Sequence, residues 1–110
     1  MIVAIDLGST SIKVCVYGVE GVCVASASRP TPRYNPYEAQ HPEWVFWNPD
    51  EVWARVGECF REIGSCLELS KVSAVAVTGM GMDGVPVDAD GNALYPFISW
   101  YCGRTAPQAK

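Results

Sequence analysis

A carboxylate, a glycine, two hydroxyls and a lysine lie close together near the start of the chain, where two apolar runs meet. They are Asp6, Gly8, Ser9, Thr10 and Lys13, in the segment MIVAIDLGSTSIKVCVYG. A glycine lets the backbone approach phosphate oxygens closely, and backbone amides and hydroxyls can donate hydrogen bonds to them. A lone carboxylate can hold Mg²⁺ directly or through water, and a lysine can place a charge beside a transferring phosphoryl group. The segment predicts either a phosphate-binding turn or an ordinary tight turn whose polar side chains satisfy local amides.

Composition narrows the class of protein. The chain has 110 residues, of which 49% are hydrophobic, so one small domain with a core is expected. A net charge of −4 with only eight Lys and Arg residues argues against nucleic acid as a partner. No apolar run approaches the roughly 18 residues of a membrane span, and no signal peptide is recognisable. Five cysteines without CxxC spacing indicate a reduced, cytoplasmic protein without a zinc site.

The elements that must position the polar turn can be predicted from periodicity. Short β-branched runs predict three strands joined by tight turns, an apolar stripe predicts a helix that Asn48 can cap, and a further apolar run predicts a fourth strand. The predicted strands are 2–6, 12–17, 22–27 and 72–78, and the predicted helix is 49–68. A long, proline-rich loop with aromatic anchors is expected at 29–48, and further extended segments at 85–88 and 93–101.

The order of these elements is βββ-α-β. A helix between two strands of one sheet favours parallel pairing of those strands. The predicted fold is therefore α/β, with a mixed sheet of the RNase H-like type, which occurs in nucleases and, duplicated, in the actin-like ATPases.

Three ordered segments together resemble a known family. DLGSTSIK, at residues 6–13, resembles the first phosphate motif of the FGGY carbohydrate kinases, which belong to the actin-like ATPase superfamily. HPEWVFWNPDEVWARV resembles the family's loop before a helix, and VAVTGMGMDG with SWYCGRTA resembles its second strand, substrate loop and Trp-containing segment. The GMDG and SWYCGRTA forms are most similar to the fuculokinase and rhamnulokinase branch.

The resemblance implies a role for each matching residue. In the phosphate motif 6–13, Asp6 would associate with the metal and the remaining polar positions would contact phosphate; these are Gly8, Ser9, Thr10 and Lys13. The substrate loop 79–84 and the Trp segment 98–105 would contact the sugar through Gly81, Met82, Asp83, Trp100 and Arg104.

Local chemistry agrees with the roles implied for the sugar residues without requiring them. Asp83 could accept hydrogen bonds from sugar hydroxyls, and Trp100 could lay an apolar face against sugar C–H groups. Asp83 is equally a turn residue, Trp100 equally a core residue, and Arg104 would more often be a surface charge.

The family's enzymes are several times longer than this chain. Residues 1–110 are therefore expected to form an incomplete, truncated N-terminal domain without the second domain or the general-base aspartate, and to be inactive alone. The intact enzyme is expected to use ATP and Mg²⁺ to phosphorylate a ketose such as L-fuculose, L-rhamnulose or xylulose. Apolar surface left by the missing half would favour a homo-oligomer.

Two other functions are compatible with the predicted fold. An RNase H-like nuclease would gather Asp6 with Asp83 or Asp88 around two metal ions about 4 Å apart. A non-catalytic nucleotide-binding domain of the actin-like group would need the phosphate turn but not the GMGMDG segment.

Overall fold

A computed structural model describes residues 1–109. The chain forms two compact units, each assembled from two separate stretches of sequence. Unit 1 comprises Met1–Thr31 and Val52–Met80, and unit 2 comprises Pro32–Glu51 and the described residues from Gly81 onward. Each unit is described by itself below.

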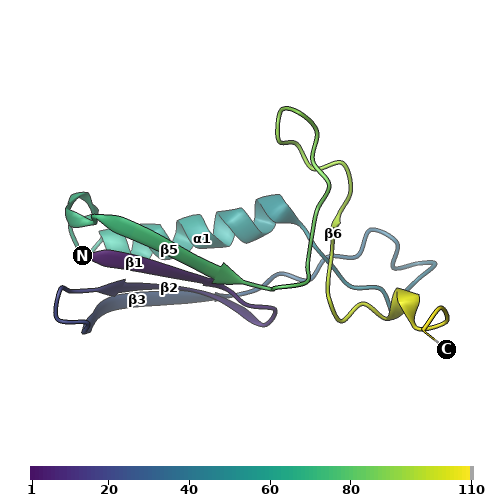
Figure 1. Cartoon of the computed structure of the whole chain (residues 1–110), viewed down its shortest axis with the longest axis horizontal. Coiled ribbons are helices and arrows are strands. Elements are labelled where there is room, and N and C mark those ends of the chain that lie inside the picture. Colours follow the sequence, from purple (N-terminus) through teal and green to yellow (C-terminus); the bar gives the residue numbers. More distant parts are fainter. Residues whose placement is uncertain (110) are drawn as a thin grey trace. The chain divides into compact units, whose positions relative to one another are not determined.

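Unit 1 contains a mixed four-stranded sheet (Figure 1). The strands are β1 (Ile2–Leu7), β2 (Ser11–Tyr17), β3 (Cys23–Pro30) and β5 (Ala74–Gly79). Their order across the sheet is β3-β2-β1-β5; β1 pairs antiparallel with β2 and parallel with β5. The predicted order βββ-α-β and the predicted parallel pairing are both confirmed.

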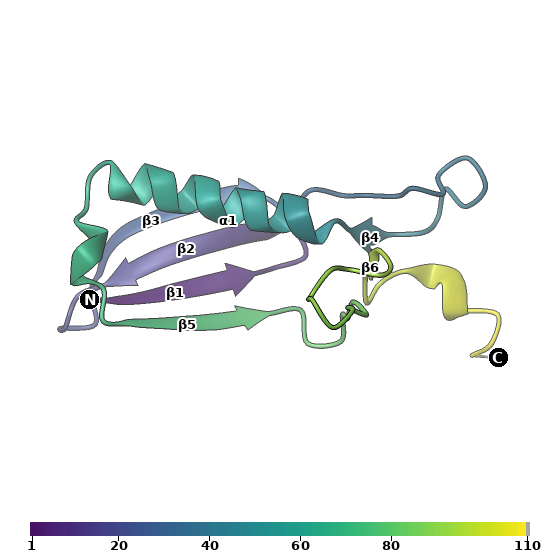
Figure 2. The ribbon, with the colours of Figure 1, turned by 90° about the horizontal axis from the view of Figure 1, so that it is seen from above.

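Helix α1 (Pro49–Gly64) packs over one face of this sheet (Figure 2). Alternate residues of β1 and β2 point toward the helix, as the two-residue period of a strand requires. The buried side chains at this interface are Val3, Ile5, Ile12, Val14, Val16, Val52, Val56, Cys59 and Ile63. Val75 and Val77 of β5 pair in register with Val3 and Ile5, yet their side chains are 57% and 63% exposed. The helix therefore covers β1 but leaves β5 open.

A network of ion pairs connects β3 to α1. Arg29 Nε lies 3.1 Å from Glu58 Oε2, and Arg29 Nη2 lies 2.7 Å from Glu62 Oε2. Arg55 adds a second contact to Glu58, at 2.6 Å. Because Glu58 and Glu62 are one helical turn apart, a single guanidinium can contact both.

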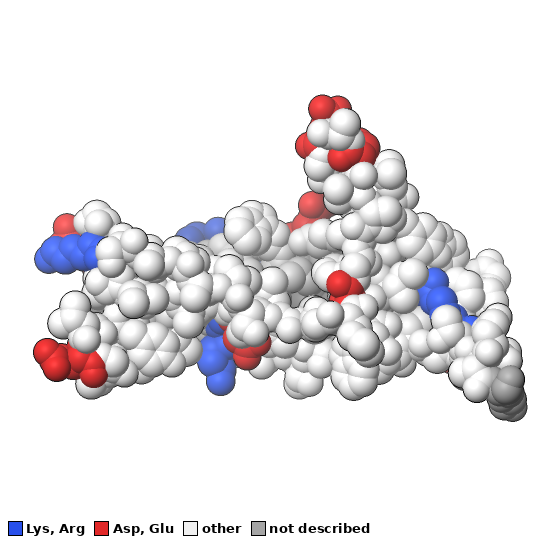
Figure 3. Space-filling model, in the orientation of Figure 1, with Lys and Arg blue, Asp and Glu red and all other residues white. Residues whose placement is uncertain are grey.

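Unit 2 contains a short two-stranded sheet and an aromatic cluster. The rings of this cluster are those of Tyr37, Trp44, Phe46 and Tyr95. Strand β4 (Phe46–Trp47) pairs antiparallel with β6 (Phe97–Ile98), and both residues of β4 are buried. The chain then forms a 3₁₀ turn, η2 (Gly103–Thr105). Figure 3 shows acidic side chains at the tip of the loop that joins β5 to β6.

Several predicted strand ends differ from the structure by one or two residues, and three predictions were wrong by more. The helix ends at Gly64 rather than at residue 68, because the chain turns there so that Leu69 packs on the helix end; a Cβ at Gly64 would lie 3.3 Å from Leu69 Cδ1. The segment 85–88 makes only an isolated bridge from Val87 to Ala93, since Pro86 has no N–H to extend a ladder. Strand β3 also runs further than predicted, to Pro30.

The expected loop at 29–48 contains β4, and the expected extended segment at 93–101 contains only the two residues of β6. A second 3₁₀ turn, η1 (Leu69–Lys71), leads into β5. Within residues 1–109, every helix is too short or too polar to cross a membrane.

Candidate functional site

The predicted phosphate turn joins β1 to β2 in unit 1. The amide of Gly8 donates to the Ser11 carbonyl at 3.1 Å and closes the turn. A Cβ at position 8 would lie 2.8 Å from the same carbonyl oxygen, so only glycine fits this backbone without movement. Within residues 1–109, the backbone amides and hydroxyls of Ser9 and Thr10 have no hydrogen-bond acceptor. These groups are therefore available as donors to an anion.

Thr31, which directly follows β3, makes two hydrogen bonds to the turn. Its backbone amide donates to the Thr10 carbonyl at 3.0 Å, and its hydroxyl Oγ1 donates to the Gly8 carbonyl at 2.6 Å. The residue is 8% exposed. Sequence reasoning missed Thr31, because it lies 21 residues after Thr10 in a proline-rich stretch and belongs to no motif.

Asp6 and Lys13 are cross-strand partners at the same end of the sheet. They face each other in the β1–β2 register, and Thr78 of β5 faces Asp6 from the other side. All three side chains are exposed; Asp6 and Lys13 alternate with residues buried against α1, and Thr78 lies in register with Asp6, so the three form a polar row on the opposite face of the sheet. The structure thus brings the predicted metal-associated acid together with the predicted lysine. It also adds a hydroxyl, that of Thr78, which was not predicted.

The Asp6 carboxylate has the chemistry that a magnesium site requires. Within the described residues, no ion pair and no side-chain hydrogen bond occupies its oxygens. No three histidine, cysteine, aspartate or glutamate side chains of residues 1–109 gather as a metal-binding group. Mg²⁺ usually keeps several waters and takes one or two carboxylates together with substrate phosphates. A single free carboxylate beside the predicted phosphate turn fits that mode.

Two of the predicted sugar residues meet in unit 2. Asp83 Oδ1 accepts the backbone amide of Trp100 at 2.6 Å, and Asp83 Oδ2 accepts the indole N–H of Trp47 at 2.8 Å. The Tyr101 ring lies edge-on to the rings of Trp47 and Trp100, with centroid distances of 5.8 and 5.4 Å. The Trp100 side chain remains 56% exposed, and neighbouring Met82 is 82% exposed. The cluster therefore presents the Trp100 indole to solvent, beside the partly buried carboxylate of Asp83.

Arg104 lies inside the aromatic cluster of unit 2. Its guanidinium carbon is 4.3 Å from the centroids of both Trp44 and Phe46, and Nε donates to Cys102 Sγ at 3.2 Å. Burial raises the pKa of the Cys102 thiol, but hydrogen bonds from the Val45 amide and from Arg104 lower that pKa, and lowering prevails. A sugar contact by Arg104 stays a prediction: the guanidinium packs against these two rings, and its Nη2 is buried without a hydrogen-bond partner within the described residues.

Comparison with known proteins defines the family. The whole chain, residues 1–110, matches the family described as "FGGY family of carbohydrate kinases, N-terminal domain". The chain belongs to the FGGY family of carbohydrate kinases.

The relatives of this FGGY chain include kinases of several small substrates. It is 38% identical over 106 residues to the L-fuculokinase of Escherichia coli (strain K12), covering 96% of this chain and 22% of that protein. It is 32% identical to the glycerol kinase of Thermococcus gammatolerans, covering 96% of this chain and 21% of that protein. The chain therefore spans about a fifth of the length of these curated relatives.

A solved structure agrees with the fold of this FGGY chain. The xylulose kinase of Rhodospirillum rubrum superimposes with a TM-score of 0.82 at 29% identity, over 96% of this chain and 21% of that one. The mixed sheet with one covering helix is thus the actin-like ATPase fold that the element order predicted.

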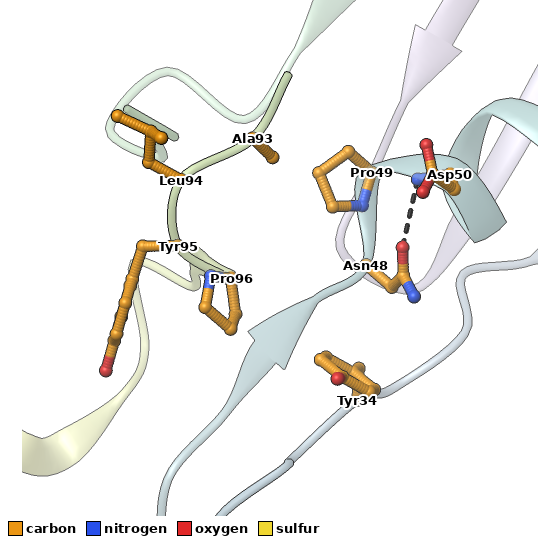
Figure 4. Close-up of a pocket in the computed structure, with 8 residues that line it drawn as sticks. All are labelled: Tyr34, Asn48, Pro49, Asp50, Ala93, Leu94, Tyr95 and Pro96. Carbon is orange, nitrogen blue, oxygen red and sulfur yellow. Dashed lines mark hydrogen bonds between the residues drawn. The ribbon is translucent and has the colours of Figure 1, made fainter. Parts of the chain in front are cut away.

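A surface hollow of about 250 Å³ in unit 2 lies at the start of α1 (Figure 4). Its lining includes Tyr34, Tyr95 and Asn48, whose Oδ1 accepts the Asp50 amide at 3.0 Å and so caps the helix. None of the residues predicted to contact sugar in the FGGY chain lines it. The hollow therefore gives no support to the predicted sugar site.

Proposed function

We propose that this chain supplies the phosphate turn and one side of the sugar site of an enzyme that transfers a phosphoryl group from ATP to a sugar hydroxyl. The observation that carries the proposal is the FGGY family match over residues 1–110, in a chain whose β1–β2 turn has free donors beside a free carboxylate. Family membership also favours this function over the nuclease and the non-catalytic nucleotide-binding domain.

The residues of the turn would act on the phosphate end of ATP. The amides and hydroxyls of Ser9 and Thr10 would donate to phosphate oxygens, and Gly8 would keep the turn tight enough to present them. Asp6 would hold Mg²⁺ directly or through water; when bound, the ion offsets negative charge on the phosphate oxygens. Lys13 would place its ammonium beside the transferring group. Catalysis by these groups is mainly positioning and electrostatic.

The cluster in unit 2 would act on the sugar. Asp83 has acceptor capacity beyond its two hydrogen bonds, because a carboxylate can accept about four. The exposed Trp100 face would cover sugar C–H groups, and Gly81 and Met82 would approach from the same loop. We also propose that Arg104 contacts the sugar on this side of the site, with its guanidinium held by the aromatic cluster. The likeness to L-fuculokinases supports L-fuculose as first choice, before L-rhamnulose and xylulose.

We place the general base outside residues 1–110 and therefore expect no turnover by this chain alone. The cytoplasm is the proposed location, since all five cysteines are free thiols. The substrates are then ATP and a small sugar, with no role for nucleic acid or membrane.

A coupled assay of ADP release tests the function. The protein that carries this sequence in full length is offered the three ketoses, with glycerol as a comparison polyol and an RNA–DNA hybrid as the nuclease substrate. Lys13→Met should lower kcat by about 100-fold, on the scale of losing one transition-state charge contact. Lys71→Met is the matched control, because Lys71 pairs only with the exposed Glu68. Release of ADP that is independent of every sugar, or cleavage of the hybrid, would refute the proposal.

A further inference from the structure

We infer that Trp47 is a positioning residue, which fixes the sugar-facing Trp100 through the carboxylate of Asp83. The inference rests on the proposed function for its sugar readout only. Trp47 belongs to no predicted site, and its side chain is fully buried, so it does not touch a ligand itself.

The three residues form a continuous hydrogen-bonded relay within unit 2. Trp47 lies on β4, Asp83 in the glycine-rich loop and Trp100 just after β6. The indole N–H of Trp47 donates to Asp83 Oδ2 at 2.8 Å, and the amide of Trp100 donates to Asp83 Oδ1 at 2.6 Å. Both oxygens of one carboxylate therefore connect a buried ring to the backbone that carries an exposed ring.

Burial makes the Trp47 contact obligatory. An indole N–H has no acceptor function and a buried one cannot turn to water, so loss of its partner carries the full cost of desolvation. Trp47 thereby selects the position of Asp83 in which Oδ2 points at the indole. The other oxygen is then directed at the Trp100 amide.

Packing does not fix the loop that carries Asp83. A Cβ placed on Gly81 or on Gly84 would meet no atom within 4 Å, so this loop is not wedged against its surroundings. Within the described residues, this loop is attached through the relay and through an isolated bridge from Gly84 to Ile98. The Trp47–Asp83 hydrogen bond therefore largely determines where Asp83 lies.

A second contact couples the same two indoles. The Tyr101 ring is edge-on to Trp47 with an interplanar angle of 72° and to Trp100 with an angle of 82°. Edge-to-face pairs of this kind favour one ring orientation over others. The hydrogen-bond relay sets where the Trp100 backbone lies, and Tyr101 limits how its ring turns.

The test removes the indole N–H while keeping an aromatic ring. In the full-length protein, Trp47→Phe should raise the KM for the sugar about three- to tenfold, as expected for loss of one hydrogen bond, with kcat and the KM for ATP changed less than about twofold. Trp53→Phe is the matched control, because that indole is 71% exposed on α1 and makes no hydrogen bond within residues 1–109. The double variant W47F/W100A should bind sugar no more weakly than W100A.

A spectroscopic readout does not depend on activity. With 5-fluorotryptophan incorporated, the ¹⁹F resonance of Trp100 should shift in W47F and stay unchanged in W53F. If W47F does not fold, Asp83→Asn is measured instead, since an amide has one acceptor oxygen and cannot serve both donors. An unchanged Trp100 resonance, or multiplicative effects of W47F and W100A on sugar binding, would overturn the relay. A shifted resonance in a protein that phosphorylates no sugar would leave the relay standing and reject the proposed function.

Discussion

The residues that would meet ligands and the residues that hold them in place differ in how well the sequence shows them. Asp6, Lys13 and Asp83 could be proposed as site residues from the sequence, because short motifs mark them and their chemistry is local; their roles remain predictions. Thr31 and Trp47 could not, because each acts through a hydrogen bond to a partner more than twenty residues away. Such partners are decided by how the chain folds, which no local pattern encodes.

Thr31→Val should loosen the phosphate turn. The substitution keeps the shape of the side chain but removes the hydroxyl that donates to the Gly8 carbonyl, leaving a part-buried acceptor without a partner. We expect the free energy of unfolding to fall by about 1–2 kcal/mol. Chemical denaturation measures this, and Thr31→Ser, which retains the hydroxyl, should recover most of the loss. Equal destabilisation by both variants would contradict this role of the hydroxyl, because Thr31→Ser keeps it.

At the scale of elements, long periodic segments were predicted correctly and short ones were not. Strands β1, β2 and β5 and the start of α1 follow from apolar runs and a capping residue. Strands β4 and β6 have two residues each, too few for any period to show. They exist because Phe46 and Trp47 of β4 are buried among rings that include Tyr95 and Tyr101, from a distant part of the chain. The end of α1 was misplaced for a similar reason, since Leu69 packs back on Gly64.

The ion pairs between β3 and α1 give a prediction at this scale. Arg29→Met keeps an unbranched apolar stem but removes the charge that contacts Glu58 and Glu62, so α1 should be held less firmly. Because these groups are partly exposed, we expect a loss of about 1 kcal/mol in unfolding free energy at low salt.

Denaturation in 1 M NaCl should reduce that difference, since the Debye length falls to about 3 Å. Arg61→Met is the matched control, because Arg61 is exposed on the same helix and has no ion pair within the described residues. A loss that does not change with salt would indicate packing by the arginine stem instead.

At the scale of the whole molecule, the exposed strand β5 is the feature that the composition could not reveal. Its residues are exposed along the full length of the strand, including two valines on the face toward α1. A strand with open backbone groups and apolar side chains is a template for association with another chain. We therefore expect the predicted self-association to occur through β5.

The double substitution Val75→Thr and Val77→Thr should weaken self-association of the 110-residue chain. Threonine keeps the β-branched shape while replacing a methyl with a hydroxyl, so we expect the dissociation constant to rise about tenfold. Sedimentation velocity over a concentration series measures it. The matched control is V19T/V22T, which changes two exposed valines in the turn between β2 and β3. An equal effect of both pairs would show that association is not directed by β5.

The parallel pairing of β1 with β5 also determines the order in which the sheet can form during synthesis. Ile2 of β1 pairs with Ala74 of β5, so β1 lacks its second neighbouring strand until residue 74 has been synthesised. Strands β2 and β3 follow β1 directly in the sequence and can pair within microseconds. Until then, the nascent chain carries a three-stranded meander in which β1 is unpaired on the side that β5 will occupy. Any chaperone that shields this polypeptide on the ribosome would therefore be needed most between the emergence of Leu7 and that of Gly79.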